Sequence, residues 1–190
     1  MASLLRAPAV DAQPGTAPVV ISEPDPRKFM TAFATAVAGK SDVFLCDPRW
    51  SENERKQVAA VLASQPGLAS PKPGNGEGGW LMIPTGGTSG QIKFARHDGH
   101  TLAAAVRGFT QHFGLKTVNA VGLLPLHHVS GLMAWMRCLM TEGEYLSLDW
   151  KAIEAGKLPV LPGQPEGWVL SLVPTQLERL VRSEATVDWL

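Results

Sequence analysis

The sequence predicts an α/β fold, with an incomplete and mostly parallel sheet flanked by helices. Short apolar runs bounded by turn-forming residues alternate along the chain with segments whose apolar residues recur at helical spacing. The chain has 190 residues, of which 45% are hydrophobic and 18% charged, so it can build a sizeable core.

The first part of the chain predicts two helices around one strand. Phe29 and Phe33 recur at helical spacing, and Gly39 can end that helix. Ser51 and Glu54 form a capping box, the pattern that opens a helix. The expected elements are an extended, proline-rich arm at 1–26, a helix at 27–38, a strand at 43–46, a helix from 51 to about 64 and a Pro/Gly-rich loop at 66–78.

The rest of the chain alternates strands and helices more regularly. Asp98 can cap one helix, Gly114 can end it, and Pro174 stands where another would begin. The expected elements are strands at 80–83 and 92–96, a helix at 101–113, a strand at 118–124, a helix at 130–140, strands at 145–148 and 168–173, and a helix at 174–182.

Residues 187–190 break off where an α/β protein would next place a strand, so the sheet is expected to be unfinished. An unfinished sheet exposes an apolar edge, and we therefore expect limited stability or self-association through it. The expected segments are an arm at 1–26, a helix–strand–helix segment and loop at 27–78, and a partial α/β subdomain at 79–190.

Charge and cysteine usage exclude several classes of protein. Lys plus Arg equals Asp plus Glu at 17 each, which argues against a general nucleic-acid or membrane-surface binder. Cys46 and Cys138 lie far apart and outside any metal-ligand spacing, so free, buried thiols in a reducing cytoplasm are expected. Residues 1–10 lack the features of a signal peptide, and the longest apolar stretch, 129–140, is too short to span a bilayer.

The strongest local signal is the run from Pro84 to Lys93, which is rich in glycine and hydroxyl residues and lies between two predicted strands. Glycines let backbone N–H groups approach a ligand, and successive N–H groups in such a turn form an anion-binding concavity. The run lacks the Gly-Lys-Ser/Thr of a Walker A loop and the glycine spacing of a dinucleotide fingerprint. Composition alone leaves two readings open, a phosphate-binding loop and a plain hairpin turn.

The same run resembles the phosphate-binding signature of the adenylate-forming superfamily, usually Thr-Ser-Gly-Thr-Thr-Gly-x-Pro-Lys, with Gly86 in place of the Ser and Ile92 in place of the Pro. Residues 124–132 are similar to that superfamily's next motif, Pro-Leu-x-His-x-x-Gly, at a suitable separation. Within the superfamily, the chain most resembles o-succinylbenzoate–CoA ligase of cyanobacterial type. The stretches that carry this likeness are 83–87, 91–95, 128–132 and 171–177, and the whole resemblance covers about 79–182.

The resemblance implies an AMP-forming acid–CoA ligase of menaquinone or phylloquinone synthesis. Its partners would be a small carboxylic acid, ATP with Mg²⁺, and CoA. The acid attacks the α-phosphorus of ATP to give an acyl-adenylate, and the CoA thiol then displaces AMP. The implied phosphate-binding residues are Thr85, Gly86, Gly87, Thr88, Ser89, Gly90 and Lys93; His128 is the implied catalytic residue, and Ser130, Gly131, Thr175 and Gln176 the implied acid-binding ones.

The superfamily's acidic motif, ribose-binding aspartate, hinge and catalytic lysine cannot be placed before Leu190, so the chain alone is expected to be inactive. The first alternative is a short, non-catalytic nucleotide-binding or interaction protein of the same ancestry. The second is a generic α/β protein whose glycine-rich loop is only a turn.

Other candidate groups favour structural interpretations. No Cys, Asp or Glu flanks His127 and His128 at ligand spacing, and adjacent residues rarely point at one ion, so no metal site is expected. His97 and His100 are expected to be exposed beside the cap Asp98. Ser130 lacks a nucleophile elbow, which argues against a hydrolase. Thr175 and Gln176 stand at the end of a strand, where they serve either as ligand-binding residues or as helix caps.

Overall fold

The computed structural model describes residues 17–64, 79–85, 90–155, 157 and 167–182. The predicted loop at 66–78, the chain end at 187–190 and the four loop residues Gly86, Gly87, Thr88 and Ser89 lie outside the described residues. The described part forms two compact units. The N-terminal unit holds the described residues up to 103 together with 127–129, and the C-terminal unit holds 104–126 and the residues from 130 onward. The predicted segments 1–26, 27–78 and 79–190 stay predictions.

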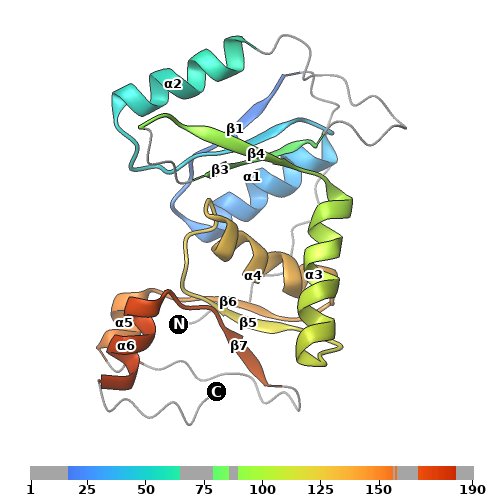
Figure 1. The fold of residues 1–190 in the computed structure, drawn as a ribbon, viewed down its shortest axis with the longest axis vertical. Coiled ribbons are helices and arrows are strands. Elements are labelled where there is room, and N and C mark those ends of the chain that lie inside the picture. The colour runs from blue at the N-terminus through green and yellow to red at the C-terminus, as the bar shows by residue number, and fades with distance from the viewer. Residues whose placement is uncertain (1–16, 65–78, 86–89, 156, 158–166, 183–190) are drawn as a thin grey trace. The chain divides into compact units, whose positions relative to one another are not determined.

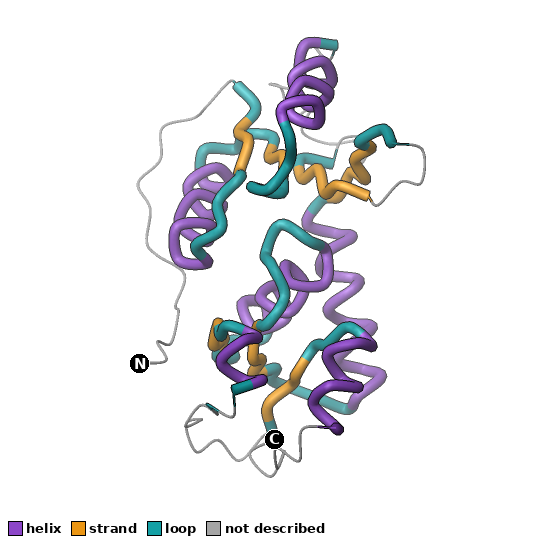
Figure 2. Tube along the Cα trace, turned by 90° about the vertical axis from the view of Figure 1, so that its left-hand side faces the viewer, coloured by secondary structure: helices purple, strands orange, loops and turns teal. Residues whose placement is uncertain are grey.

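The N-terminal unit contains a four-stranded sheet in the order β1-β2-β3-β4. Strands β1 (Val19–Ile21), β2 (Val43–Leu45) and β3 (Leu81–Thr85) are parallel, and β4 (Lys93–His97) runs antiparallel to β3. Helices α1 (Pro26–Ala38) and α2 (Glu52–Ala63) lie on opposite sides of this sheet (Figures 1 and 2).

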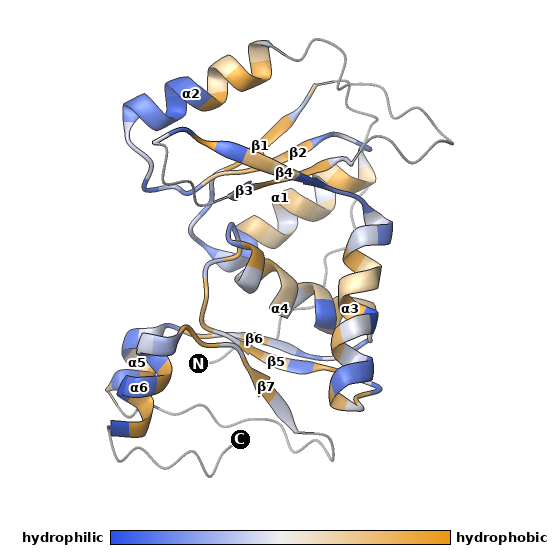
Figure 3. Cartoon of the chain, viewed as in Figure 1, coloured by the Kyte–Doolittle hydropathy of each residue, from blue (hydrophilic) through white to orange (hydrophobic). Residues whose placement is uncertain are grey.

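Local signals explain both helices of this unit. Asp25 caps α1 by accepting a hydrogen bond from the backbone N–H of Lys28 at 2.9 Å, and Pro26 follows it. In α2, the Ser51 side chain and the Glu54 side chain form the predicted capping box. Figure 3 shows α2 as hydrophilic in its first half and apolar in its second half.

The C-terminal unit contains a three-stranded, fully parallel sheet in the order β6-β5-β7. Its strands are β5 (Asn119–Gly122), β6 (Tyr145–Ser147) and β7 (Trp168–Leu170), and its helices include α4 (Val129–Met140), α5 (Trp150–Glu154) and α6 (Pro174–Arg182). Helix α3 (Gly99–Phe113) begins in the N-terminal unit and continues into this one.

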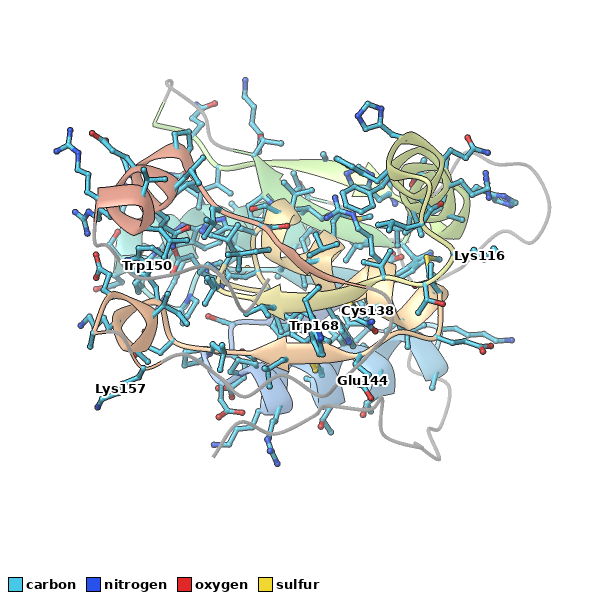
Figure 4. The ribbon with its side chains drawn as sticks, turned by 90° about the horizontal axis from the view of Figure 1, so that it is seen from below. Lys116, Cys138, Glu144, Trp150, Lys157 and Trp168 are labelled. Atoms are coloured by element: carbon cyan, nitrogen blue, oxygen red, sulfur yellow. The ribbon has the colours of Figure 1, made fainter. Side chains whose placement is uncertain are left out.

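A small core holds the sheet of the C-terminal unit against its last helices. Val121, Leu123, Ile153 and Leu180 are buried together, and Trp150 packs against them. Glu144 precedes β6 and Trp150 follows it, so the two residues lie at opposite ends of the sheet (Figure 4). The core therefore joins β5 to α5 and α6.

The mostly parallel α/β class is confirmed, although the strands are divided between two sheets. The helix predicted at 174–182 has those bounds, and Asp98 caps α3 as predicted. The prediction missed two short elements. Strand β1 forms within the expected arm, and the five-residue helix α5 forms behind its cap Asp149.

Cys46 and Cys138 are free and buried, as predicted. Burial raises the pKa of each thiol to about 12, so both are protonated near neutral pH. Within the part of the chain that the structure describes, no helix is long and apolar enough to cross a membrane.

Candidate functional site

The glycine-rich loop is held between two antiparallel strands. β3 and β4 pair from Leu81 opposite His97 to Thr85 opposite Lys93, so the loop leaves and re-enters the sheet at a fixed point. The Thr85 hydroxyl donates a hydrogen bond to the Lys93 carbonyl at 3.3 Å, which closes this end of the ladder. The predicted flanking strands are thereby confirmed. Whether the loop binds phosphate stays a prediction.

Gly90 has a backbone conformation that favours glycine. Its φ is 68°, in the left-handed region where a Cβ atom would crowd the backbone. No other described atom lies within 4 Å of the position of that Cβ, so the requirement is one of backbone strain rather than of space. The chain therefore turns at Gly90 on its way into β4.

A side chain of α2 fixes the same turn from outside the loop. The Gln57 amide nitrogen donates to the Gly90 carbonyl at 3.3 Å, and the Gln57 amide oxygen accepts from the Ile92 N–H at 2.8 Å. Gln57 lies in the second turn of a helix whose start is fixed by a capping box. The Gln57 side chain thus forms hydrogen bonds with two backbone groups at the end of the loop, the Gly90 carbonyl and the Ile92 N–H.

Lys93 provides the positive charge at this site. Its side chain is exposed, and it forms no ion pair with any other residue that the structure describes. An exposed ammonium group without a protein counter-ion can meet an anionic ligand without first breaking a salt bridge. The arrangement has the two features that phosphate binding needs, a glycine turn and a nearby cation.

The two adjacent histidines have different surroundings. The His127 side chain is 5% exposed, and its Nε2 lies 3.5 Å from Asp47 Oδ2, whereas His128 is exposed. Burial lowers the pKa of His127, the neighbouring His128 lowers it further, and Asp47 opposes both effects. His127 is therefore neutral near pH 7, and its contact with Asp47 is a polar contact rather than an ion pair.

Asp47 is held by a neighbouring cation. Arg49 donates to the two carboxylate oxygens of Asp47 from Nε at 3.1 Å and from Nη2 at 2.8 Å. These hydrogen bonds hold the pKa of Asp47 well below its usual range, although its partial burial acts in the opposite direction. A carboxylate therefore faces the buried His127 ring.

The predicted acid-binding residues lie in the C-terminal unit. Ser130 and Gly131 lie in the first turn of α4, which follows β5, and Thr175 and Gln176 lie in the first turn of α6, which follows β7. Since β5 and β7 are parallel neighbours, the two helix starts share the carboxyl edge of one sheet, where open α/β sheets bind ligands.

Two of these residues also have a structural role. The Gln176 side chain accepts a hydrogen bond from the Val173 N–H at 3.1 Å and so caps α6. A Cβ atom on Gly131 would lie 2.2 Å from the Pro125 carbonyl oxygen, so glycine is needed there for close packing. Ser130 and Thr175 are exposed.

Three solved structures share this fold. The N-terminal domain of FACL13 from Mycobacterium tuberculosis, solved with an inhibitor, aligns with a TM-score of 0.57 and 15% identity over 74% of this chain and 48% of its own. The adenylation domain of a keto acid-selecting NRPS module, bound to a keto acyl adenylate, aligns at 0.55 and 15% identity over 77% of this chain and 34% of its own. A putative long-chain-fatty-acid CoA ligase from Rhodopseudomonas palustris aligns at 0.52 and 16% identity, over 90% of this chain and 53% of its own.

The chain has the fold of the N-terminal part of an adenylate-forming ligase domain. It spans from about a third to about half of the length of these three solved chains. No protein-family description and no curated protein matches the sequence. The likeness to the ligases therefore lies in the fold.

Sequence reasoning did not find Gln57 or Asp47 as parts of the site. Gln57 lies 33 residues before Gly90, and Asp47 lies 80 residues before His127. No local sequence pattern connects residues so far apart. The fold brings them together, because β2 pairs with β3 in one sheet and the Gln57 side chain of α2 bonds to the backbone of Gly90 and Ile92. The acidic neighbour missing from the sequence around His127 comes from the end of β2.

Proposed function

We propose that this chain is the nucleotide-binding part of an AMP-forming acid–CoA ligase and that the loop from Thr85 to Gly90 holds the β and γ phosphates of ATP. The single observation that carries the proposal is the geometry of the β3–β4 hairpin. Gly90 has a positive φ there, the Gln57 amide donates a hydrogen bond to the Gly90 carbonyl, and Lys93 is exposed at the start of β4. The ligase-like fold supports the same assignment independently.

The loop residues and Lys93 have different proposed roles in binding ATP. Backbone N–H groups of the loop bind the phosphate oxygens, the hydroxyls of Thr88 and Ser89 add donors, and Lys93 offsets part of the negative charge. Mg²⁺ enters with ATP as part of the substrate complex. In this proposal His128 is the catalytic residue, and Ser130, Gly131, Thr175 and Gln176 bind the acid.

For the acid itself, we propose o-succinylbenzoate, with transfer of the acyl group to CoA. The support is the likeness of residues 83–87, 128–132 and 171–177 to the corresponding stretches of o-succinylbenzoate–CoA ligases. The solved relatives act on other acids by their names, so the substrate is the part of the proposal that most needs an experiment.

Calorimetric titration of the chain with Mg-ATP tests the nucleotide assignment. We expect binding that weakens about tenfold or more in Thr88→Val and Gly87→Ala, because the loop loses donors or its backbone freedom. Thr110→Val on α3 is the matched control and should bind as the parent does. If the loop variants bind as tightly as the parent protein, the loop is only a turn.

Acid-dependent exchange of pyrophosphate into ATP, measured on the complete ligase, tests the substrate. We expect exchange with o-succinylbenzoate and little with long-chain fatty acids or 2-keto acids. Exchange with one of those acids instead would overturn the substrate and leave the ligase class intact. ATP binding without exchange with any acid would favour a non-catalytic nucleotide-binding protein.

A further inference from the structure

Asp47, His127 and His128 form a cluster outside the proposed phosphate loop, although His128 is also the proposed catalytic residue. One possible ligand atom of each residue lies within 4.8 Å of the corresponding atoms of the other two. All three residues belong to the N-terminal unit, Asp47 just after β2 and the histidines in the segment 127–129. Two imidazoles and a carboxylate are a common ligand set for transition metals.

The orientation of the two rings removes the main objection to a shared ion. Neighbouring residues usually direct their side chains apart, yet the ring centroids of His127 and His128 are 4.4 Å apart and the rings are tilted by 50°. Ligand atoms that bind one Zn²⁺ at about 2 Å lie within about 4 Å of one another. The distances between the three ligand atoms, at most 4.8 Å now, therefore need to shorten only to about 4 Å for the residues to bind one ion.

The buried ring nitrogen is a second, independent observation. His127 Nε2 is buried and has no hydrogen-bond partner among the residues that the structure describes, although Asp47 Oδ2 is only 3.5 Å away. A buried polar atom without a partner costs about 1–3 kcal/mol, and native proteins rarely leave one unsatisfied. An ion between His127 and Asp47 would supply the missing partner.

We propose that Asp47, His127 and His128 bind one divalent transition-metal ion, with Zn²⁺ as the reference ion. Three protein ligands leave a fourth tetrahedral position for water. Mg²⁺ and Ca²⁺ are excluded as the natural occupants of this site, because they prefer sites made of oxygen ligands.

Arg49 competes with the ion in this arrangement. Its guanidinium binds both oxygens of Asp47, and its side chain is 76% exposed, so it can move into solvent without losing buried contacts. The backbone N–H of Arg49 also donates to Asp47 Oδ1 at 2.9 Å, and that bond can remain to orient the carboxylate. Removal of the guanidinium should therefore tighten metal binding.

The test uses the untagged chain after treatment with a chelator. Zn²⁺ binding is measured by calorimetry and by competition with a chromophoric chelator, and Co²⁺ is used to report the geometry by its visible absorption. We expect one Zn²⁺ per chain, the absorption typical of tetrahedral Co²⁺, and no competition by millimolar Mg²⁺.

Three variants separate this site from adventitious binding. His128→Gln, at an exposed position, should weaken Zn²⁺ binding about 10–100-fold, and Arg49→Gln should strengthen it severalfold. His112→Gln, exposed at the end of α3, is the matched control and should change nothing. Equal affinity in the parent protein, His128→Gln and His112→Gln would overturn the proposal, as would the absence of Zn²⁺ binding or weaker binding in Arg49→Gln.

Discussion

At the scale of single residues, Gln57 is the side chain that links α2 to the proposed phosphate loop. Replacing it with leucine removes both of its hydrogen bonds. The partly buried N–H group of Ile92 then loses its acceptor. Loss of such a pair costs about 1–2 kcal/mol, which corresponds to a loss of about 5–30-fold in Mg-ATP affinity if the bound loop needs this turn. Calorimetric titration of Gln57→Leu measures the effect.

A second measurement on the same variant is independent of ATP. Amide hydrogen exchange at Ile92 should become faster in Gln57→Leu, because that N–H then faces no acceptor from α2. Gln111→Leu on α3 is the control with the same change of side chain. Unchanged exchange at Ile92 would show that the Gln57 contact does not hold the turn in solution.

Cys138 gives a second prediction at this scale. Burial raises its pKa to about 12, so the protonated thiol is both inaccessible and unreactive in the folded state. In a Cys46→Ser background, we expect almost no alkylation by iodoacetamide at pH 8 without denaturant and complete alkylation in urea. Rapid labelling of the folded protein would indicate that the C-terminal end of α4 opens.

The raised pKa of Cys138 also makes the stability of the folded state depend on pH. The unfolded thiol ionises near its ordinary pKa of 9.0, and the folded thiol does so only near 12. The folded state is therefore favoured below pH 9 and loses stability as the pH rises from 9 toward 12. Alkaline unfolding should begin at a higher pH in a folded Cys138→Ala variant than in the parent protein.

At the scale of elements, the close contact at the start of α4 predicts opposite effects for two glycine-to-alanine changes. A Cβ on Gly131 would lie 2.2 Å from the Pro125 carbonyl and 2.6 Å from that of Leu124, and backbone atoms cannot move away cheaply. Gly108 lies exposed within α3, and a Cβ added there would meet no described atom within 4 Å. We expect Gly131→Ala to lower the free energy of unfolding by about 1–3 kcal/mol and Gly108→Ala to raise it by up to about 1 kcal/mol.

Urea unfolding followed by circular dichroism measures both glycine variants. Because the two changes are chemically identical and both positions are helical, the comparison isolates the effect of the packing around Gly131. Equal shifts of the two unfolding midpoints would mean that the α4 start is more loosely packed than the structure indicates.

The helices were the most predictable elements, since their signals are local. The Ser51–Glu54 capping box and Pro174 each mark a helix start within a few residues of sequence. Strand β1 was missed because its three residues stand in a proline-rich stretch and gain their order only by pairing with β2. Helix α5 was missed because five residues are too few for a periodic pattern.

The site was less predictable than the fold for the same physical reason. The glycine-rich loop has a signal of its own, and the strands that flank it were found from sequence. Gln57 contacts the loop end, and Asp47 contacts His127, over separations of 33 and 80 residues in the sequence. A single sequence holds no pattern that reports such pairs.

At the scale of the whole molecule, the balance of charge predicts how the protein behaves in solution. The net charge is zero at pH 7 and the isoelectric point is about 7.0, while several apolar side chains on α6 and just before it are exposed, Leu177 at 53% and Val181 at 75%. Without net repulsion between molecules, exposed apolar groups associate more readily. Solubility in an ammonium sulfate series should pass through a minimum near pH 7 and rise toward pH 5 and pH 9. The double variant Leu177→Glu, Val181→Glu should raise solubility at pH 7 with little change in the melting temperature, because more than half of each residue is already exposed to water. A solubility that does not vary between pH 5 and pH 9 would mean that contacts other than charge repulsion control association.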